Sequence, residues 1–220
     1  MGEQTGEWVN EQAGEQMSEN AMLYVKVLVD PQIDFVSGVF GTAEARAVAG
    51  CWARFLAPAT AAECRADGAS GRLYMITRDS HPAPYCEAPE SRIFATPHCV
   101  AGTEGAAFVA PVDEAVRAQA GNPAYRVCEK NGFTCVDLPE AIIGAAEDCS
   151  FACSPDGKGM KIVLCGVVTD ICVLANALYL QARLPWADVA VDVAGCAGVT
   201  PQSHEKALEI MATLGIKIME

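Results

Sequence analysis

The stretch that decides the fold reads Met160-Lys161-Ile162-Val163-Leu164-Cys165-Gly166-Val167-Val168-Thr169-Asp170-Ile171-Cys172-Val173. Residues 160–164 form a short apolar run with β-branched side chains, bounded by a Gly/Pro-rich segment, and this pattern predicts a buried strand. From 171 to 183 the apolar residues have helical spacing, and Thr169 or Asp170 is expected to cap that helix. A strand followed at once by a helix therefore places Cys172 in the first helical turn.

Cys172 at this position has two interpretations. In open α/β sheets, ligands bind outside the carboxyl ends of the strands, so Cys172 is a candidate nucleophile. The positive end of a helix would also favour the thiolate and lower the pKa of the thiol. Alternatively, Cys172 is one more small buried hydrophobic residue, as free cysteines often are.

Length and composition predict one globular α/β domain. The chain has 220 residues, of which 51% are hydrophobic. This length and hydrophobic content are enough to form a large core. Residues 1–20 are polar and acidic and lack the pattern of a signal peptide, so we expect a lead-in, disordered or peripherally helical, before a domain at 21–220. No apolar run is long enough to span a bilayer. These features, with 11 irregularly spaced cysteines that we interpret as reduced thiols, favour a cytoplasmic protein.

The net charge of −13 argues against a nucleic-acid partner or an anionic membrane surface, because both attract Lys and Arg. A small molecule is the expected partner.

Strands alternate with helices along the whole chain. This order predicts a mostly parallel, six-stranded sheet with helices on both faces, a Rossmann-like three-layer α/β fold. The expected strands are 22–29, 73–77, 125–128, 160–164, 187–193 and 216–218. The expected helices are 43–66, with a break near Pro58, 112–120, 138–149, 171–183 and 201–214. The irregular segment 82–108 is long, and such loops usually carry function.

Three reactive side chains lie at or beside the ends of predicted strands: Asp30, Lys130 and Cys172. The carboxyl ends of parallel strands share one edge, so these residues are expected to converge. The thiol could attack a substrate while the carboxylate moves a proton and the ammonium stabilises the charged forms. Each residue alone could be a capping or solvated group, but their coincidence favours a nucleophilic site.

A separate pattern points to a metal. Asp79 and His81 are two residues apart at the end of an extended segment and therefore face the same side. His98 would be a third ligand, and Glu87 and Glu90 are candidates for a fourth. Carboxylate and imidazole ligands suit Zn, Fe or Mn. Alternatively, the histidines are ordinary loop residues.

The third histidine of the chain, His204, lies among charged residues on a predicted helix and is expected at the surface.

These motifs together resemble the nicotinamidases, within the isochorismatase-like cysteine hydrolases. The resemblance runs from about residue 23 to the C-terminus and is carried, in order, by Asp30-Pro31-Gln32-Ile33-Asp34-Phe35, Asp79-Ser80-His81, His98-Cys99-Val100-Ala101-Gly102-Thr103-Glu104-Gly105-Ala106, Lys130, and Gly166-Val167-Val168-Thr169-Asp170-Ile171-Cys172-Val173. The chain departs from the family at Ser80, where a Trp or Phe is common, and at Asn176, where the family has Thr.

The resemblance implies a role for each site residue. Cys172 would be the nucleophile, Asp30 the general acid and base, and Lys130 the supporting cation. The N–H groups of Val168 and Cys172 would form the oxyanion hole after a cis peptide bond between Val167 and Val168. One divalent ion, Zn by preference with Fe or Mn as alternatives, would be held by Asp79, His81, His98 and Glu90, the last preferred over Glu87. Phe35, Phe94 and Val167 would form the substrate pocket.

The implied activity is a metal-dependent amidohydrolase that converts nicotinamide to nicotinate and ammonia through a Cys thioester, in NAD salvage. A homo-oligomer is compatible with this assignment. One alternative is another cysteine amidohydrolase of the same superfamily, acting on a carbamoyl compound or another small amide. The other is a non-catalytic binding domain of this fold.

Overall fold

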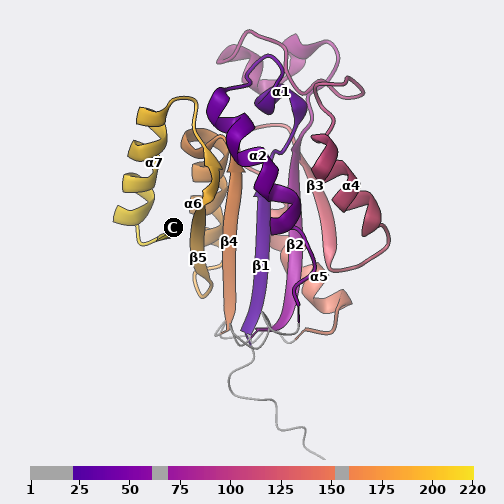
Figure 1. Cartoon of the computed structure of the whole chain (residues 1–220), viewed down its shortest axis with the longest axis vertical. Helices are drawn as coiled ribbons and strands as arrows, with labels where there is room; N and C mark the ends of the chain where they lie inside the picture. The colour runs from indigo at the N-terminus through magenta and orange to yellow at the C-terminus, as the bar shows by residue number, and fades with distance from the viewer. Residues whose placement is uncertain (1–21, 61–68, 152–158) are drawn as a thin grey trace, which may run out of the picture.

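The computed structural model describes residues 22–60, 69–151 and 159–220, so the expected lead-in at 1–20 lies outside the described residues. Its centre is a six-stranded sheet in the order β3-β2-β1-β4-β5-β6, with every neighbouring pair parallel (Figure 1). The predicted α/β class and six-stranded sheet are confirmed. The strands are β1 (Met22–Val29), β2 (Ala69–Asp79), β3 (Tyr125–Lys130), β4 (Met160–Val167), β5 (Asp188–Ala197) and β6 (Lys217–Met219).

Helices cover both faces of this sheet. In Figure 1, α2 crosses in front of the strands, whereas α5 and α6 lie behind them. The helices are α1 (Ile33–Val36), α2 (Ala43–Phe55), α4 (Ala110–Ala118), α5 (Leu138–Asp148), α6 (Leu174–Arg183) and α7 (Pro201–Thr213), with short 3-10 turns η1 (Tyr85–Glu87) and η2 (Pro89–Arg92) and a π-helical turn η3 (Thr169–Val173). The result is the predicted three-layer arrangement.

The central strands β1 and β4 are apolar because both of their faces are covered, as parallel sheets require. Val25, Val27, Ile162 and Leu164 are all fully buried. Gly166, near the end of β4, has a φ of +126°, and a Cβ there would lie 2.2 Å from the carbonyl oxygen of Val29. Only glycine allows this approach, which sets the end of β4 against the end of β1.

Helix α2 ends at Phe55, which agrees with the predicted break near Pro58, because proline disfavours helix in the residue before it. Residues 61–66 of that prediction lie outside the described residues. The long segment between β2 and α4 has only the turns η1 and η2, as its composition indicated. It lies at the upper end of the sheet in Figure 1, where the carboxyl ends of the strands meet.

The prediction that Thr169 or Asp170 caps the helix that carries Cys172 is wrong. The chain enters a π-helical turn after Val168, without a side-chain cap. Thr169 Oγ1 is instead hydrogen-bonded to Nδ1 of His204, at 2.8 Å, and Asp170 Oδ1 accepts from the N–H of Val199. His204, which was expected at the surface, is partly buried, because α7 packs against η3.

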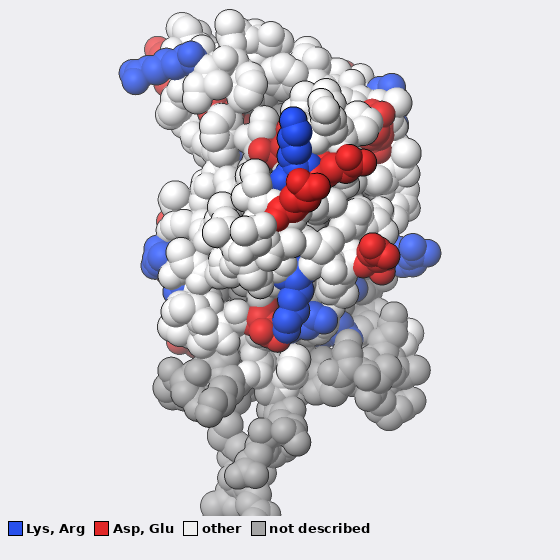
Figure 2. All heavy atoms as spheres, turned by 90° about the vertical axis from the view of Figure 1, so that its left-hand side faces the viewer, with Lys and Arg blue, Asp and Glu red and all other residues white. Residues whose placement is uncertain are grey.

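The face drawn in Figure 2 has acidic and basic side chains lying beside one another, and its upper end is largely uncharged. The described cysteines are free thiols. Within the described residues, no helix is both long enough and apolar enough to cross a membrane.

Candidate active site

Asp30 follows β1 directly and is fully buried. Its φ of +48° lies in the left-handed region, which residues with a side chain rarely adopt and which often marks functional positions. Thr77 holds it from β2: its Oγ1 accepts from the Asp30 N–H at 3.1 Å and donates to Asp30 Oδ1 at 2.6 Å. The carboxyl group is therefore fixed in one orientation.

Lys130 ends β3 and brings its ammonium into the same buried space. Its Nζ lies 2.9 Å from Oδ2 of Asp30, 3.2 Å from Oδ1 of Asp79 and 3.7 Å from Sγ of Cys172. Burial lowers the pKa of Lys130, but its electrostatic interactions with Asp30, Cys172 and Asp79 outweigh this effect and raise the pKa well above its ordinary value. Lys130 therefore stays positively charged.

Cys172 lies in η3, and its Sγ and the Asp30 carboxylate both lie next to the Lys130 ammonium, at 3.7 Å and 2.9 Å. Burial raises the pKa of this thiol well above its ordinary value, and nearby Asp30 and Asp79 add to the effect against the opposing charge of Lys130. The pKa lowering expected from the helix start is therefore wrong, because desolvation dominates. Burial also raises the pKa of Asp30, and this effect outweighs the charge of Lys130 and the hydrogen bond from Thr77, which both lower it. A reaction at Cys172 must accordingly transfer the thiol proton, and Asp30 is in place to accept it.

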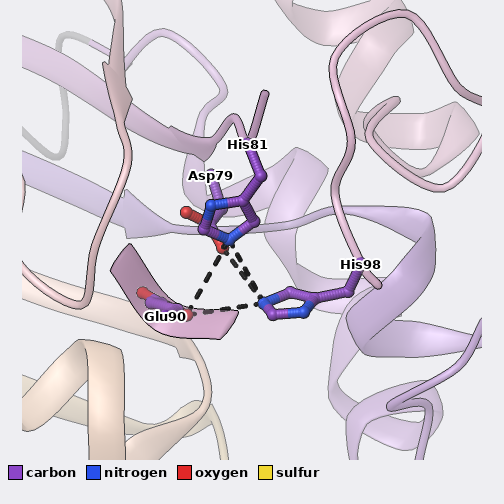
Figure 3. Close-up of side chains that lie close together, drawn as sticks. All are labelled: Asp79, His81, Glu90 and His98. Atoms are coloured by element: carbon purple, nitrogen blue, oxygen red, sulfur yellow. Dashed lines mark hydrogen bonds and ion pairs between the residues drawn. The ribbon is translucent and has the colours of Figure 1, made fainter. Parts of the chain in front are cut away.

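Asp79, His81, Glu90 and His98 form a second buried group next to this centre. Asp79 ends β2, His81 lies two residues further along, Glu90 is in η2, and His98 lies in the loop before α4. Figure 3 shows their polar ends pointing toward one another. One ligand atom from each lies within 4.8 Å of the others. His81 Nε2 is 2.9 Å from Asp79 Oδ2, and His98 Nε2 is 3.5 Å from Glu90 Oε2.

The hydrogen bonds around this cluster fit a cation. His81 Nδ1 lies 2.8 Å from Asn131 Oδ1 and His98 Nδ1 lies 3.1 Å from the carbonyl oxygen of Thr96. Both neutral rings therefore carry their proton on Nδ1, and their bare Nε2 atoms face each other at 3.3 Å. Among the described residues, buried Oε1 of Glu90 has no hydrogen-bond partner. Two imidazoles and two carboxylates are ligands that suit Zn, Fe or Mn.

Without a cation, the same cluster attracts protons. Burial disfavours the charged form of His98, but hydrogen bonds to Asp79 and Glu90 outweigh this and raise its pKa to about 9. Burial likewise raises the pKa of Asp79, yet its hydrogen bonds to both histidines and the charge of Lys130 lower it below its ordinary value. A divalent ion would compete with these protons.

Of the two glutamates considered for the cluster, Glu90 is buried in it, whereas Glu87 is exposed.

A cavity of about 140 Å³ lies between the thiol centre and the cluster. Both groups open on it, through Cys172 on one side and Asp79, Glu90 and His98 on the other. The rest of the lining is mainly apolar: Phe35, Phe40, Thr42, Phe94, Phe133, Val168, Ile171 and Val199. Phe35 and Phe94, which the resemblance implies for the substrate pocket, both line this cavity. Val167 does not line the cavity, because its side chain is fully buried in the core.

The peptide bond between Val167 and Val168 is cis, as expected from the resemblance.

Several residues of the site carried no signal in the sequence. Thr77 looked like an ordinary strand residue, and Phe40 and Phe133 lay in short loops. Asn176 Nδ2 donates to the carbonyl oxygen of Cys172 at 2.8 Å, and its Oδ1 accepts from the N–H of Cys135 at 2.9 Å. A buried amide of this kind can be noticed as an isolated polar residue in an apolar helix, but its partner Cys135 lies 41 positions away in the chain.

Solved structures of known proteins share this fold. The nicotinamidase/pyrazinamidase of Bacillus subtilis is 21% identical, with a TM-score of 0.67, and the alignment covers 90% of this chain and 100% of that one. The pyrazinamidase of Pyrococcus horikoshii, solved in complex with zinc, is 25% identical, with a TM-score of 0.62 and coverage of 90% and 98%. The N-carbamoylsarcosine amidase of Thermoplasma acidophilum is 21% identical, with a TM-score of 0.59 and coverage of 90% and 96%.

A search of curated protein sequences finds no match to this chain. A family model described as the isochorismatase domain matches residues 24–220.

Proposed function

The chain belongs to the isochorismatase family of hydrolases, and from that premise we propose that it hydrolyses nicotinamide to nicotinate and ammonia. The observation that carries this proposal is the shared cavity. A buried thiol with a carboxylate and an ammonium opens on it from one side, and a cluster suited to a divalent ion opens on it from the other. Four phenylalanines lie between them, and they suit a flat aromatic ring.

Attack on the amide begins at Cys172. As Sγ bonds to the carboxamide carbon, its proton passes to the Asp30 carboxylate, which lies with the thiol beside the Lys130 ammonium. Lys130, 2.9 Å from Asp30, stabilises the negative charge while it moves between sulfur and carboxylate. The oxyanion would be held by the N–H groups of Val168 and Cys172.

The second half of the reaction returns the site to its starting state. Asp30 gives its proton to the departing ammonia, which leaves a thioester on Cys172. Asp30, again a carboxylate, takes a proton from water as that water attacks the thioester carbon. Nicotinate is released, and the proton returns from Asp30 to the sulfur.

The metal would be held by Asp79, His81, Glu90 and His98. A bound divalent ion would supply a Lewis acid that binds or orients the pyridine nitrogen, directly or through water. Asn131 and the Thr96 carbonyl orient the two imidazoles for this task. This cluster is what favours a pyridine amide over other amides, since the thiol centre alone would serve any small carboxamide.

Ammonia release from nicotinamide, pyrazinamide and N-carbamoylsarcosine by the zinc-loaded protein tests the substrate. We expect activity on the two aromatic amides and little on the carbamoyl compound. The reverse preference would support the carbamoyl amidohydrolase alternative and contradict nicotinamide as substrate.

Absence of any turnover, together with a Cys172 that no thiol reagent modifies, would instead indicate a binding domain.

A further inference from the structure

Asn176 is a fully buried polar residue of α6 whose side chain reaches two separate parts of the active site. Its Nδ2 donates to the carbonyl oxygen of Phe133 at 3.1 Å and to that of Cys172 at 2.8 Å. Its Oδ1 accepts from the N–H of Cys135 at 2.9 Å. Because Phe133 and Cys172 both line the cavity, one amide group connects two parts of the cavity wall from behind.

The carboxamide of Asn176 fits these partners in one orientation. The two carbonyl oxygens accept hydrogen bonds and lie against Nδ2, whereas the N–H group donates and lies against Oδ1. A carboxamide supplies the two donors and the acceptor that this arrangement needs. The threonine that the family has at this position carries a single hydroxyl donor on a shorter side chain, so it could not make all three hydrogen bonds.

The first of the two connected parts is the segment 130–135, called the Lys130 loop below. Lys130, at its start, is fixed by the ion pair with the carboxylate of the thiol centre, at 2.9 Å. Asn131 orients one imidazole of the buried cluster, and the ring of Phe133 packs against that of Phe94 with 5.9 Å between centroids. Asn176 holds the other end of this loop.

The second part is the π-helical turn η3, which carries the nucleophile. The N–H of Val173 donates to the carbonyl oxygen of Val168 at 3.1 Å, five positions back, as in a π-helix. Cys172 lies where this turn passes into α6, and its carbonyl oxygen is the one that accepts from Asn176. The same side chain therefore supports the turn of the nucleophile and the end of the Lys130 loop.

We propose that Asn176 is a positioning residue that fixes the distance between the Phe133 wall of the cavity and the sulfur of Cys172. A ring that packs against Phe133 is thereby placed with its carboxamide carbon at the thiol. The coupling of the Lys130 loop to η3 is independent of the substrate, whereas its effect on turnover rests on the proposed function. A misplacement of about 1 Å between reacting groups can slow a reaction about 100-fold.

Steady-state kinetics of Asn176→Thr test the effect on turnover. We expect kcat for nicotinamide to fall about 10- to 100-fold, because the turn of Cys172 loses a support. KM should rise about two- to tenfold, because the Phe133 ring shifts. Trp52→Phe is the matched control, since it removes another fully buried hydrogen bond, from the indole to the carbonyl oxygen of Gly195 at 2.9 Å. It should lower the free energy of unfolding and leave kcat and KM unchanged.

A double-mutant cycle tests whether Asn176 acts on the substrate through Phe133. Phe133→Ala removes the ring but keeps the carbonyl oxygen that Asn176 binds. If the ring transmits the effect, adding Asn176→Thr to Phe133→Ala should raise KM no further, although kcat should still fall. KM increases that multiply would overturn the positioning of Phe133, and an unchanged kcat in folded Asn176→Thr would overturn the positioning of Cys172.

Amide hydrogen exchange of the full-length proteins tests the coupling without any turnover. Asn176→Thr should speed exchange about two- to tenfold in peptides that cover 131–137 and in peptides that cover 169–174, the range expected for one lost hydrogen bond. Trp52→Phe should leave both segments at the wild-type rate. Faster exchange in both segments of a protein that does not hydrolyse nicotinamide would support the coupling and contradict only the proposed function.

Asn176→Asp is a second variant, in case threonine does not fit the site. It keeps the size of the side chain and an acceptor for the Cys135 N–H, but a carboxyl group has at most one donor for the two carbonyl oxygens. Its exchange should rise in the same two segments. Wild-type exchange in either segment of both variants would overturn the coupling, and failure of both to fold would show that Asn176 stabilises the fold and would contradict a positioning role.

Discussion

The ammonium of Lys130 lies 3.2 Å from Oδ1 of Asp79, so one buried ion pair joins the thiol centre to the acid–imidazole cluster. The same Nζ is 2.9 Å from Asp30. The carboxylates of Asp30 and Asp79 thus share the ammonium of Lys130 in a buried space. The protonation state of each carboxylate therefore depends on that of the other. Substitutions of residues that contact Asp30 should consequently shift the pH profile of the reaction.

The pH profile tests Asp30 as the base. Burial raises its pKa above the ordinary 3.8, and the base must be ionised to accept the thiol proton. Activity should therefore fall as the pH drops, with the midpoint of the acidic limb of kcat/KM above 3.8.

Thr77→Val should move that limb. Its hydroxyl donates to Asp30 and lowers the carboxyl pKa, so removal should raise the pKa and shift the limb to higher pH. The loss also leaves buried polar atoms of Asp30 unpaired, at a cost of about 1–3 kcal/mol in unfolding free energy. Thr103→Val, at an exposed threonine, is the control and should leave the limb in place. An unmoved limb in a folded Thr77→Val protein would contradict the role of Asp30.

Metal analysis tests the cluster. The purified protein should bind about one divalent ion per chain, and a chelator should remove both the ion and the activity. Glu90→Gln should weaken zinc binding by at least the roughly 10- to 100-fold that is typical for loss of a group that only orients a ligand.

Glu87→Gln is the matched control, because Glu87 lies three positions away in the chain and is exposed. Equal affinities of the two glutamine variants, measured by zinc titration, would remove Glu90 from the ligand set.

The aromatic lining should determine substrate affinity. Phe40 lies 4.8 Å from the His98 ring and 6.4 Å from that of Phe35, between centroids, and lines the cavity. Loss of such ring contacts costs about 0.5–1.5 kcal/mol, so Phe40→Ala should raise KM for nicotinamide about two- to tenfold. Val39→Ala changes the adjacent side chain, which is 55% exposed, and should leave KM unchanged. A fall in kcat with unaltered KM in Phe40→Ala would argue against a substrate contact.

The alternation of apolar runs and helical segments was enough to predict the parallel sheet, and with it the convergence of Asp30, Lys130 and Cys172. Spacing also placed Asp79 and His81 together, since both lie at the end of one strand. The pKa of Cys172 could not be predicted, because desolvation depends on how elements from the whole chain enclose the thiol.

Side chains that act through distant partners were also missed. Thr77 supports Asp30 from 47 positions away, and Asn176 holds Cys135 from 41 positions away. Neither pair has a local pattern, and the capping role expected of Thr169 was displaced by its hydrogen bond to His204 on α7.

The central claim is that Cys172 attacks the carboxamide carbon of nicotinamide. Its most direct test is ammonia release from nicotinamide by the zinc-loaded wild type, Cys172→Ala and the control Cys86→Ala, with folding checked by circular dichroism. We predict release by the wild type and the control, and only background release by a folded Cys172→Ala protein. Release at the wild-type rate from Cys172→Ala would contradict the account.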